Sequence, residues 1–233
     1  VRFGVNAGNS IASGGNYNVV VGDNAGTAIT TGDHNTAIGF NALVTEDTGS
    51  RNTAIGRAAL EVLNYNGDGY NTAVGYAAGT AVTTGTENTL IGGLAGDALT
   101  TGHYNVAVGF EALSTEDAHG RCTALGFRAL KTLNAGTDSY NVAIGFDAGR
   151  EVTTGIENTL IGALAGDALT DADFNVAVGK GALGVCVLGS RNVAIGVAAL
   201  ANTNPSSAAS MLNTAMGYAA GYNVTTGTNN LLL

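Results

Sequence analysis

A five-residue motif recurs along this 233-residue chain, and no other feature constrains its fold as strongly. One form is Asn-Thr-Ala-Ile-Gly, and other copies replace Thr by Val, Ala by Leu or Ile by Val. Most successive copies are separated by the same interval as Asn35 and Asn52, while two intervals are longer by two positions and one is longer by four. A fixed period of this length is typical of a repeat architecture in which each copy forms one structural unit.

Positions outside the motif follow the same period. The fifth motif residue is Gly in all twelve complete copies, and the residue three places later is always Ala. The residue after that Ala is Gly or Leu in a pattern that repeats every four units, which makes a super-repeat of about 70 residues. Extra residues are confined to 64–69, 134–139 and 202–210, so we expect loops there on one face of a regular stack.

We interpret residues 1–233 as a single repeat array. Its super-repeats are assigned approximately to 18–87, 88–157 and 158–229. Both ends of the chain fall inside a repeat copy, since Val1 would follow an upstream Asn and the copy that begins at Asn230 stops before its Gly. We therefore expect the array to be a fragment of a longer fibre.

Each unit is too short for two helices, and its Gly, Asn and β-branched residues disfavour even one. The alternation in Thr36-Ala37-Ile38 predicts a short strand, and residues 81–85 predict a second strand that runs into a turn. The sequence thus predicts an all-β fold: a β-solenoid, or β-roll, of about thirteen 17-residue rungs, each hydrogen-bonded to the next.

The alternation also predicts which side chains face the interior. We place the first and third residues after each Asn inside the rung. The second and fourth, which are Ala or Leu and then the invariant Gly, are expected to form an outward stripe that another chain could approach closely. Because so short a rung has a thin core, burial of apolar surface between chains would add stability, and we expect a fibrous homotrimer.

Composition narrows the classes of partner. The formal net charge is −9, and Lys131 and Lys180 are the only lysines. Nucleic acid is therefore not an expected partner, because phosphate binding needs a basic face. Gly, Asn or Thr interrupts every apolar stretch before the ~18 residues of a membrane helix, so no membrane insertion is expected. Cys122 and Cys186 lie three rungs apart, about 14 Å at the usual strand spacing, which is too far for a disulfide.

The Asn that begins each rung is expected to stack on the Asn of the rung before it. Stacked amides satisfy the backbone groups of turns in other stacked-strand structures. Cys122 replaces Asn in one rung without disturbing the neighbouring pattern, which favours this structural role over a row of ligand-binding side chains. The predicted structural ladder consists of Asn18, Asn35, Asn52, Asn71, Asn88, Asn105, Asn141, Asn158, Asn175, Asn192 and Asn213.

The sequence contains no arrangement typical of an enzyme or a cofactor site. The histidines, His34, His103 and His119, fall in turns and are interpreted as solvated. The carboxylates of Glu46-Asp47 and Glu116-Asp117, and those of Asp97 and Asp167, recur one super-repeat apart. They could bind Ca²⁺, but the dense Asp and Gly loops of calcium-binding repeats are missing, so solvated charge is the preferred interpretation. We predict no catalytic residue, no cofactor and no metal ligand.

Aromatic residues recur at two positions of the rung. In one set, the aromatic residue stands immediately before the Asn of the rung. This set consists of Tyr17, Tyr70, Tyr104, Tyr140 and Phe174. Stacked aromatics usually pack at corners or between chains, but an outer row could hold sugar rings by their apolar sides. The set that follows the rung Gly supplies the candidate glycan contacts: Phe40, Tyr76, Phe110, Phe127, Phe146 and Tyr218.

The repeats resemble those of two families of surface protein. Asn-Thr-Ala-Ile-Gly at 35–39 and 52–56 is similar to the repeat of trimeric autotransporter adhesin heads, which are left-handed parallel β-rolls. Asn-Thr-Ala-Ile-Gly-Phe-Asn-Ala-Leu at 35–43, with Thr-Thr-Gly at 30–32 or 83–85, is more similar to repeats of phage tail fibres. The resemblance implies a trimeric fibre segment and a left-handed coil.

We therefore predict a structural and adhesive fibre segment of the phage tail fibre type, a stiff trimeric rod for attachment to a host surface. The expected partners are two further copies of the chain and a host cell-surface glycan or protein. The expected location is a virion tail fibre, or the extracellular space or cell surface. The alternatives are a bacterial surface adhesin head and, from other classes, an ice-binding solenoid or a glycan-degrading spike.

Overall fold

The computed structural model describes residues 2–233, with side chains from Phe3 onward. These residues form an all-β fold that contains no helix. The chain divides into two compact units, Val1–Gly120 and Arg121–Leu233, which are described separately.

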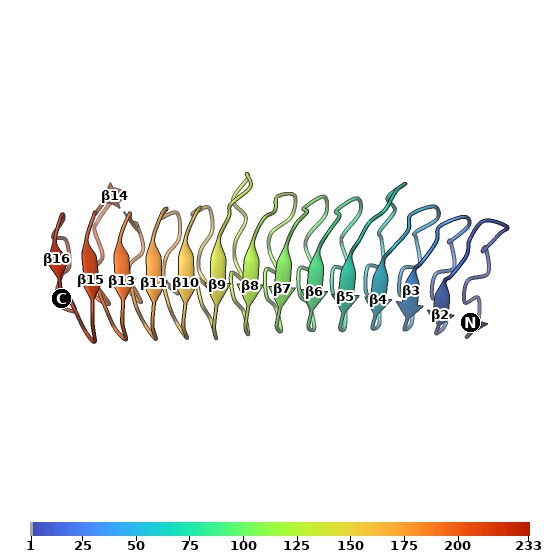
Figure 1. The fold of residues 1–233 in the computed structure, drawn as a ribbon, viewed down its shortest axis with the longest axis horizontal. Coiled ribbons are helices and arrows are strands. Elements are labelled where there is room, and N and C mark those ends of the chain that lie inside the picture. The colour runs from blue at the N-terminus through green and yellow to red at the C-terminus, as the bar shows by residue number, and fades with distance from the viewer. Residues whose placement is uncertain (1) are drawn as a thin grey trace. The chain divides into compact units, whose positions relative to one another are not determined.

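The first unit is a parallel sheet in which the strands follow one another in chain order (Figure 1). Each strand pairs with the equivalent strand of the next rung, so that Thr36 lies opposite Thr53, and Ala37 opposite Ala54. The strands are β1 (Arg2–Phe3), β2 (Val19–Val21), β3 (Thr36–Ile38), β4 (Thr53–Ile55), β5 (Thr72–Val74), β6 (Thr89–Ile91) and β7 (Val106–Val108).

The second unit repeats this arrangement. Its main strands are also parallel and in register, as in the pairing of Leu160 with Ala177. A second, two-stranded parallel sheet joins β12 (Gly189–Ser190) to β14 (Ala209–Ser210). The strands of the main sheet are β8 (Thr123–Leu125), β9 (Val142–Ile144), β10 (Thr159–Ile161), β11 (Val176–Val178), β13 (Val193–Ile195), β15 (Thr214–Met216) and β16 (Leu231–Leu232).

This topology confirms the predicted parallel β-solenoid of about thirteen rungs at a spacing of about 17 residues. The prediction of a second strand at 81–85 is wrong, because this segment consists of turns and bends. Its backbone is still bonded to the next rung, since Thr83 N–H donates to Thr100 O at 2.8 Å. A coil that must close within so short a rung spends most of its length on turns, and only a short strand such as Thr36–Ile38 remains extended.

The middle residue of each strand lines the interior. Ala37, Ala54 and Ala73 are fully buried, whereas the residues on either side of each are half-buried. The face assignment made from the sequence is therefore wrong: the first and third residues after Asn point outward, and the second points inward. Burial follows the position in the strand and not the size of the residue, because Leu90 and Leu160 occupy the same middle position and are also fully buried.

The residue that follows the invariant Ala is Gly or Leu, and the choice depends on which side chains of neighbouring rungs fill the interior beside it. A Cβ added to Gly79 would lie 2.6 Å from Leu90 Cδ1 and 3.0 Å from Leu60 Cδ2. In the second unit, a Cβ added to Gly149 would lie 2.7 Å from Leu160 Cδ1. Gly thus occurs where Leu side chains of nearby rungs already fill the space. The super-repeat of four rungs is the period of this packing.

The invariant Gly that follows each strand is required by both conformation and space. Gly92 has φ +134°, a conformation that residues with a Cβ rarely adopt. A Cβ at this position would lie 2.4 Å from Gly109 O in the next rung. Its neighbour Gly93 is different, because a Cβ there would meet only the Phe110 side chain, at 3.4 Å.

We predict that Gly92→Val lowers the free energy of unfolding by several kcal/mol, because it combines a strained φ with a clash against backbone of the next rung. Gly93→Ala is the control and should change the free energy of unfolding by less than about 0.5 kcal/mol. Thermal and urea unfolding followed by circular dichroism measures both. Equal stability of the two variants would contradict the predicted packing of the Gly column.

Candidate functional site

The repeated Asn side chains form hydrogen-bonded ladders in the interior. In the first unit, Asn88 N–H donates to Asn71 Oδ1 at 3.1 Å, and Asn88 Nδ2 donates to the same oxygen at 3.2 Å and to Gly102 O at 2.9 Å. Asn88 Oδ1 in turn accepts the N–H of Asn105 at 3.0 Å. Both amide groups, Asn71 and Asn88, are buried. The amide of Asn88 is thus used within the protein, and a ligand would have to displace backbone partners to reach it.

The second unit has the same ladder with one substitution. Cys122 occupies the Asn position, and its Sγ lies 2.7 Å from Ser139 Oγ. Both cysteines are free and buried, as expected from their separation by three rungs. Burial raises the pKa of Cys186 to about 11, so its thiol stays protonated near neutral pH and is a poor nucleophile.

The six aromatics that follow the rung Gly are all exposed, but a ring face is partly occupied in four of them, Phe40, Tyr76, Phe127 and Phe146. The Arg57 guanidinium lies 5.8 Å from the Phe40 centroid and 5.4 Å from the Tyr76 centroid. Phe127 and Phe146 stack on each other with centroids 5.3 Å apart and planes at 7°. Because neighbouring rungs cover these faces, the rings offer mainly their edges to a sugar. Phe110 is also exposed.

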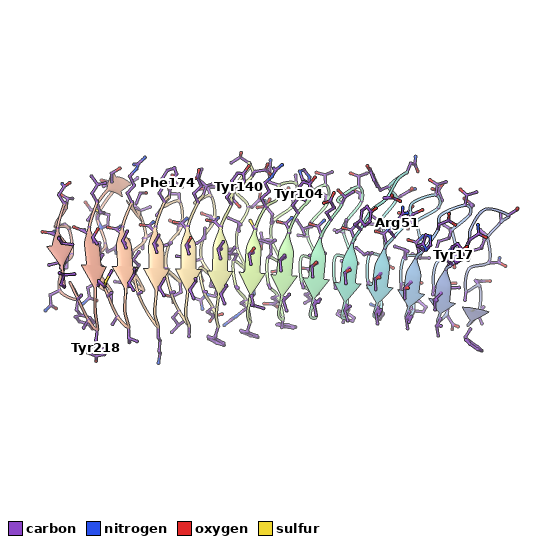
Figure 2. The ribbon with its side chains drawn as sticks, viewed as in Figure 1. Tyr17, Arg51, Tyr104, Tyr140, Phe174 and Tyr218 are labelled. Atoms are coloured by element: carbon purple, nitrogen blue, oxygen red, sulfur yellow. The ribbon has the colours of Figure 1, made fainter. Side chains whose placement is uncertain are left out.

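Tyr218 differs from the other candidate glycan contacts. It is 84% exposed because it lies in the last complete rung, and the copy that begins at Asn230 ends before a residue that could cover the ring. Figure 2 shows it at the edge of the second unit opposite the edge that carries Tyr140 and Phe174. The exposure of Tyr218 therefore reflects its place in the last complete rung and does not distinguish it as a ligand contact.

Several aromatics that precede the Asn contact a His or Arg side chain at the same position of a neighbouring rung. In the first unit (Figure 2), Tyr17 stacks on His34 with centroids 4.8 Å apart, and Arg51 lies over Tyr70 while pairing with Asp68. The second unit shows the same pattern, in which Arg121 lies over Tyr140 and pairs with Asp138, and Arg191 lies over Phe174.

These residues adopt a left-handed backbone conformation without being Gly. Tyr17 has φ +59° and Arg51 has φ +62°. This conformation costs roughly 1–2 kcal/mol for a residue with a Cβ. Gly would remove that cost, yet bulky or charged side chains occupy the position in nearly every rung.

Two acidic side chains lie inside the rung, where the sequence had suggested solvated charge. Glu46 and Glu116 are completely buried, so that interpretation is wrong for both. Glu46 Oε1 accepts the N–H of Gly49 at 2.7 Å, and its Oε2 accepts the N–H of Tyr65 in the next rung at 3.2 Å. Burial raises the pKa of Glu46 despite these hydrogen bonds. Its carboxyl group holds the loop that contains extra residues to the rung before it.

Glu116 belongs to the only cluster of side chains in the described part of the chain that could together hold a metal ion. One ligand atom each of Glu116, Asp117 and His119 lies within 4.8 Å of the others. The interpretation of His119 as a merely solvated turn residue overlooked this neighbourhood. A signal was present, because His119 stands where the corresponding residues of other rungs, Gly49 and Gly102, are glycines.

The described surface contains no pocket, so any ligand of these residues would bind to an open face or edge. The part of the chain that the structure describes has no helix long and apolar enough to cross a membrane. Comparison with family models, with curated proteins and with solved structures gives no match.

We predict that Asn158→Ala lowers the free energy of unfolding by about 1–3 kcal/mol, because it leaves buried backbone groups unpaired. The groups concerned are the N–H of Asn175, which donates to Asn158 Oδ1 at 3.0 Å, and the carbonyl of Ala172, which accepts from Asn158 Nδ2 at 2.8 Å. Asn134→Ala, at an exposed side chain, is the matched control and should be nearly neutral. Urea unfolding of the three proteins measures the difference.

The buried Glu46 predicts a pH dependence with a defined sign. Because its pKa is raised in the folded chain, its contribution to stability is present in full below the ordinary pKa of Glu and is lost as the pH rises through the raised value. The wild type should therefore gain stability relative to Glu46→Gln when the pH falls from about 7.5 to about 4.5. Urea unfolding at both values tests this, with Glu87→Gln at an exposed position as the control. A stability difference independent of pH would contradict the prediction.

Proposed function

We propose that the chain is a structural and adhesive fibre segment of the phage tail fibre type, in which three copies associate along their sheet faces to attach a virion to a host surface. The observation that carries the proposal is the outward face of the strands. In each unit it presents two columns, one of Thr and Val and one mainly of Ile, Val and Leu. Ile91 is 38% exposed and Met216 is 51% exposed.

An aliphatic face of this kind supports association of copies. Contiguous apolar patches larger than a few hundred Å² are rare on monomeric proteins and mark interaction surfaces. The face repeats in register from rung to rung, so a contact that forms at one rung can form again at the next. A second and a third copy would bury these columns and supply the apolar burial that the narrow interior does not.

The remaining surface supports the adhesive part of the proposal. Exposed aromatics line the edges of both units, including Phe40 and Tyr76 in the first and Phe127 and Phe146 in the second. The proposed partner of these edges is a glycan or protein of the host cell surface, and the proposed location is the virion tail fibre. A bacterial surface adhesin head would use the same face and the same trimer. We propose no catalytic step for the chain.

The test is the mass of the particle in solution. We expect the wild type to have three times the chain mass of 23.1 kDa by light scattering. Ile161→Lys, on the outward face of β10, should release monomers that keep the circular dichroism spectrum of the parent, because a charge on this face cannot be buried between copies. Thr154→Lys, at an exposed position away from the strand, is the control and should remain trimeric. A wild type that is monomeric at micromolar concentration would contradict the proposal.

One observation favours a second candidate, an ice-binding solenoid. Thr36, Thr53, Thr72 and Thr89 occupy four successive rungs of the first unit in register and on the outward side. Val takes the place of Thr at other rungs, including Val19 and Val106, which makes the fibre segment the preferred proposal. A thermal hysteresis measurement on the wild type separates the two candidates, because only an ice-binding protein lowers the freezing temperature of the solution below its melting temperature.

A further inference from the structure

We propose that Glu116, Asp117 and His119 form a binding site for one divalent transition-metal ion of the zinc type. The three side chains come from a single loop of the first unit, and one ligand atom of each lies within 4.8 Å of the others. An imidazole with two carboxylates matches the nitrogen and oxygen ligands that Zn²⁺ takes, whereas Ca²⁺ and Mg²⁺ prefer oxygen alone. The site does not depend on the proposed trimer.

The spacing of two ligands supports a shared ion. His119 Nδ1 lies 3.6 Å from Glu116 Oε1. This is too long for a normal N–H···O hydrogen bond, which spans about 2.7–3.2 Å. Two atoms that each lie about 2.1 Å from one tetrahedral ion are about 3.4 Å apart. The pair is therefore spaced as two ligands of one metal ion are.

The state of the imidazole nitrogen supports the same assignment independently. His119 Nδ1 is shielded from solvent and has no hydrogen-bond partner. The imidazole as a whole remains accessible, since the side chain is 32% exposed. Glu116 is fully buried, and its Oε1 accepts the backbone N–H of His119 at 3.2 Å, which holds the loop against the carboxylate. A bound cation would satisfy the shielded nitrogen and neutralise the buried carboxylate.

The equivalent loop one super-repeat earlier in the chain can be compared with this one. Residues 46–49 read Glu-Asp-Thr-Gly where residues 116–119 read Glu-Asp-Ala-His. In the first loop, Gly49 N–H donates to Glu46 Oε1 at 2.7 Å, and a Cβ on Gly49 would lie 2.5 Å from that oxygen. The first loop thus binds its carboxylate too closely to admit a side chain. The corresponding bond in the second loop is longer, and an imidazole lies beside the carboxylate.

The test titrates Zn²⁺ into the chain, produced without a polyhistidine tag and stripped with a chelator, by isothermal calorimetry. We expect one ion per chain, weaker binding of Ca²⁺, and the visible absorption of tetrahedral coordination when Co²⁺ replaces Zn²⁺. His119→Gly installs the residue of the corresponding loop, so it should fold normally, as circular dichroism can verify. Loss of a hydrogen-bond partner of a metal ligand weakens binding roughly 10- to 100-fold, so loss of the ligand itself should weaken Zn²⁺ binding by more than about tenfold.

His103→Asn, which removes a histidine from the neighbouring turn, is the matched control and should leave the Zn²⁺ affinity unchanged. Three results would overturn the proposal. They are Zn²⁺ binding that His119→Gly does not weaken, binding that His103→Asn weakens equally, and the absence of saturable binding at one ion per chain. Equal affinity for Ca²⁺ and Zn²⁺ in the wild type would also overturn it, because carboxylates alone would then account for the binding.

Discussion

Each rung is bound to the next by parallel hydrogen bonds between equivalent residues, and the other features of both units depend on this register. A residue therefore lies about 4.8 Å from its counterpart in the neighbouring rung. Amides can stack under this constraint, because each is both a donor and an acceptor, and the Asn ladder makes use of that property. Like charges directly opposite each other are destabilising. The position before the Asn reflects this. The counterpart of Arg51 in the next rung is Tyr70, which carries no charge, and Arg51 pairs with Asp68.

The same register makes the interior narrow and the outside apolar. Fully buried Ala at the strand centres and Leu or Gly in the following turns fill the rung, and little space remains. The larger β-branched side chains consequently cover the outer face of the sheet. A chain of this kind has more apolar residues than its own interior can hold, and this surplus connects the fold to the proposed association of copies.

The period of the sequence sufficed to predict the coil, its register and the alignment of the Asn residues, because equal spacing forces equal residues together. It did not predict which face of the strand is buried. Hydrophobicity alone favoured Ile38 for the interior over Ala37, but the closed coil turns the middle residue of each strand inward, whether it is Ala37 or the larger Leu90. The second strand failed for a related reason, because the turns need the residues that the pattern had assigned to it.

The individual departures from the repeat carried information that a search for known motifs missed. The eleventh residue after the Asn is Ile29, Leu63 or Leu99 in other rungs, so a Glu at position 46 or 116 lies in an aliphatic column and is expected to be buried. His119 in a Gly column is a similar departure. In a repeat protein, each such residue is best compared with its counterparts in the column, because the column shows which environment the residue enters.

The packing of Gly against Leu has a consequence for how such a chain changes length in evolution. The column reads Leu43 and Leu60 and then Gly79 and Gly96, so duplication of a single rung would place three Leu or three Gly in succession where the interior now accepts two. Duplication of a whole block of four rungs restores every contact at both joins. Growth and shortening should therefore proceed in steps of one super-repeat, the period at which the present sequence matches itself. The packing of the interior thus sets the smallest increment, one super-repeat, by which an array of these rungs can be extended.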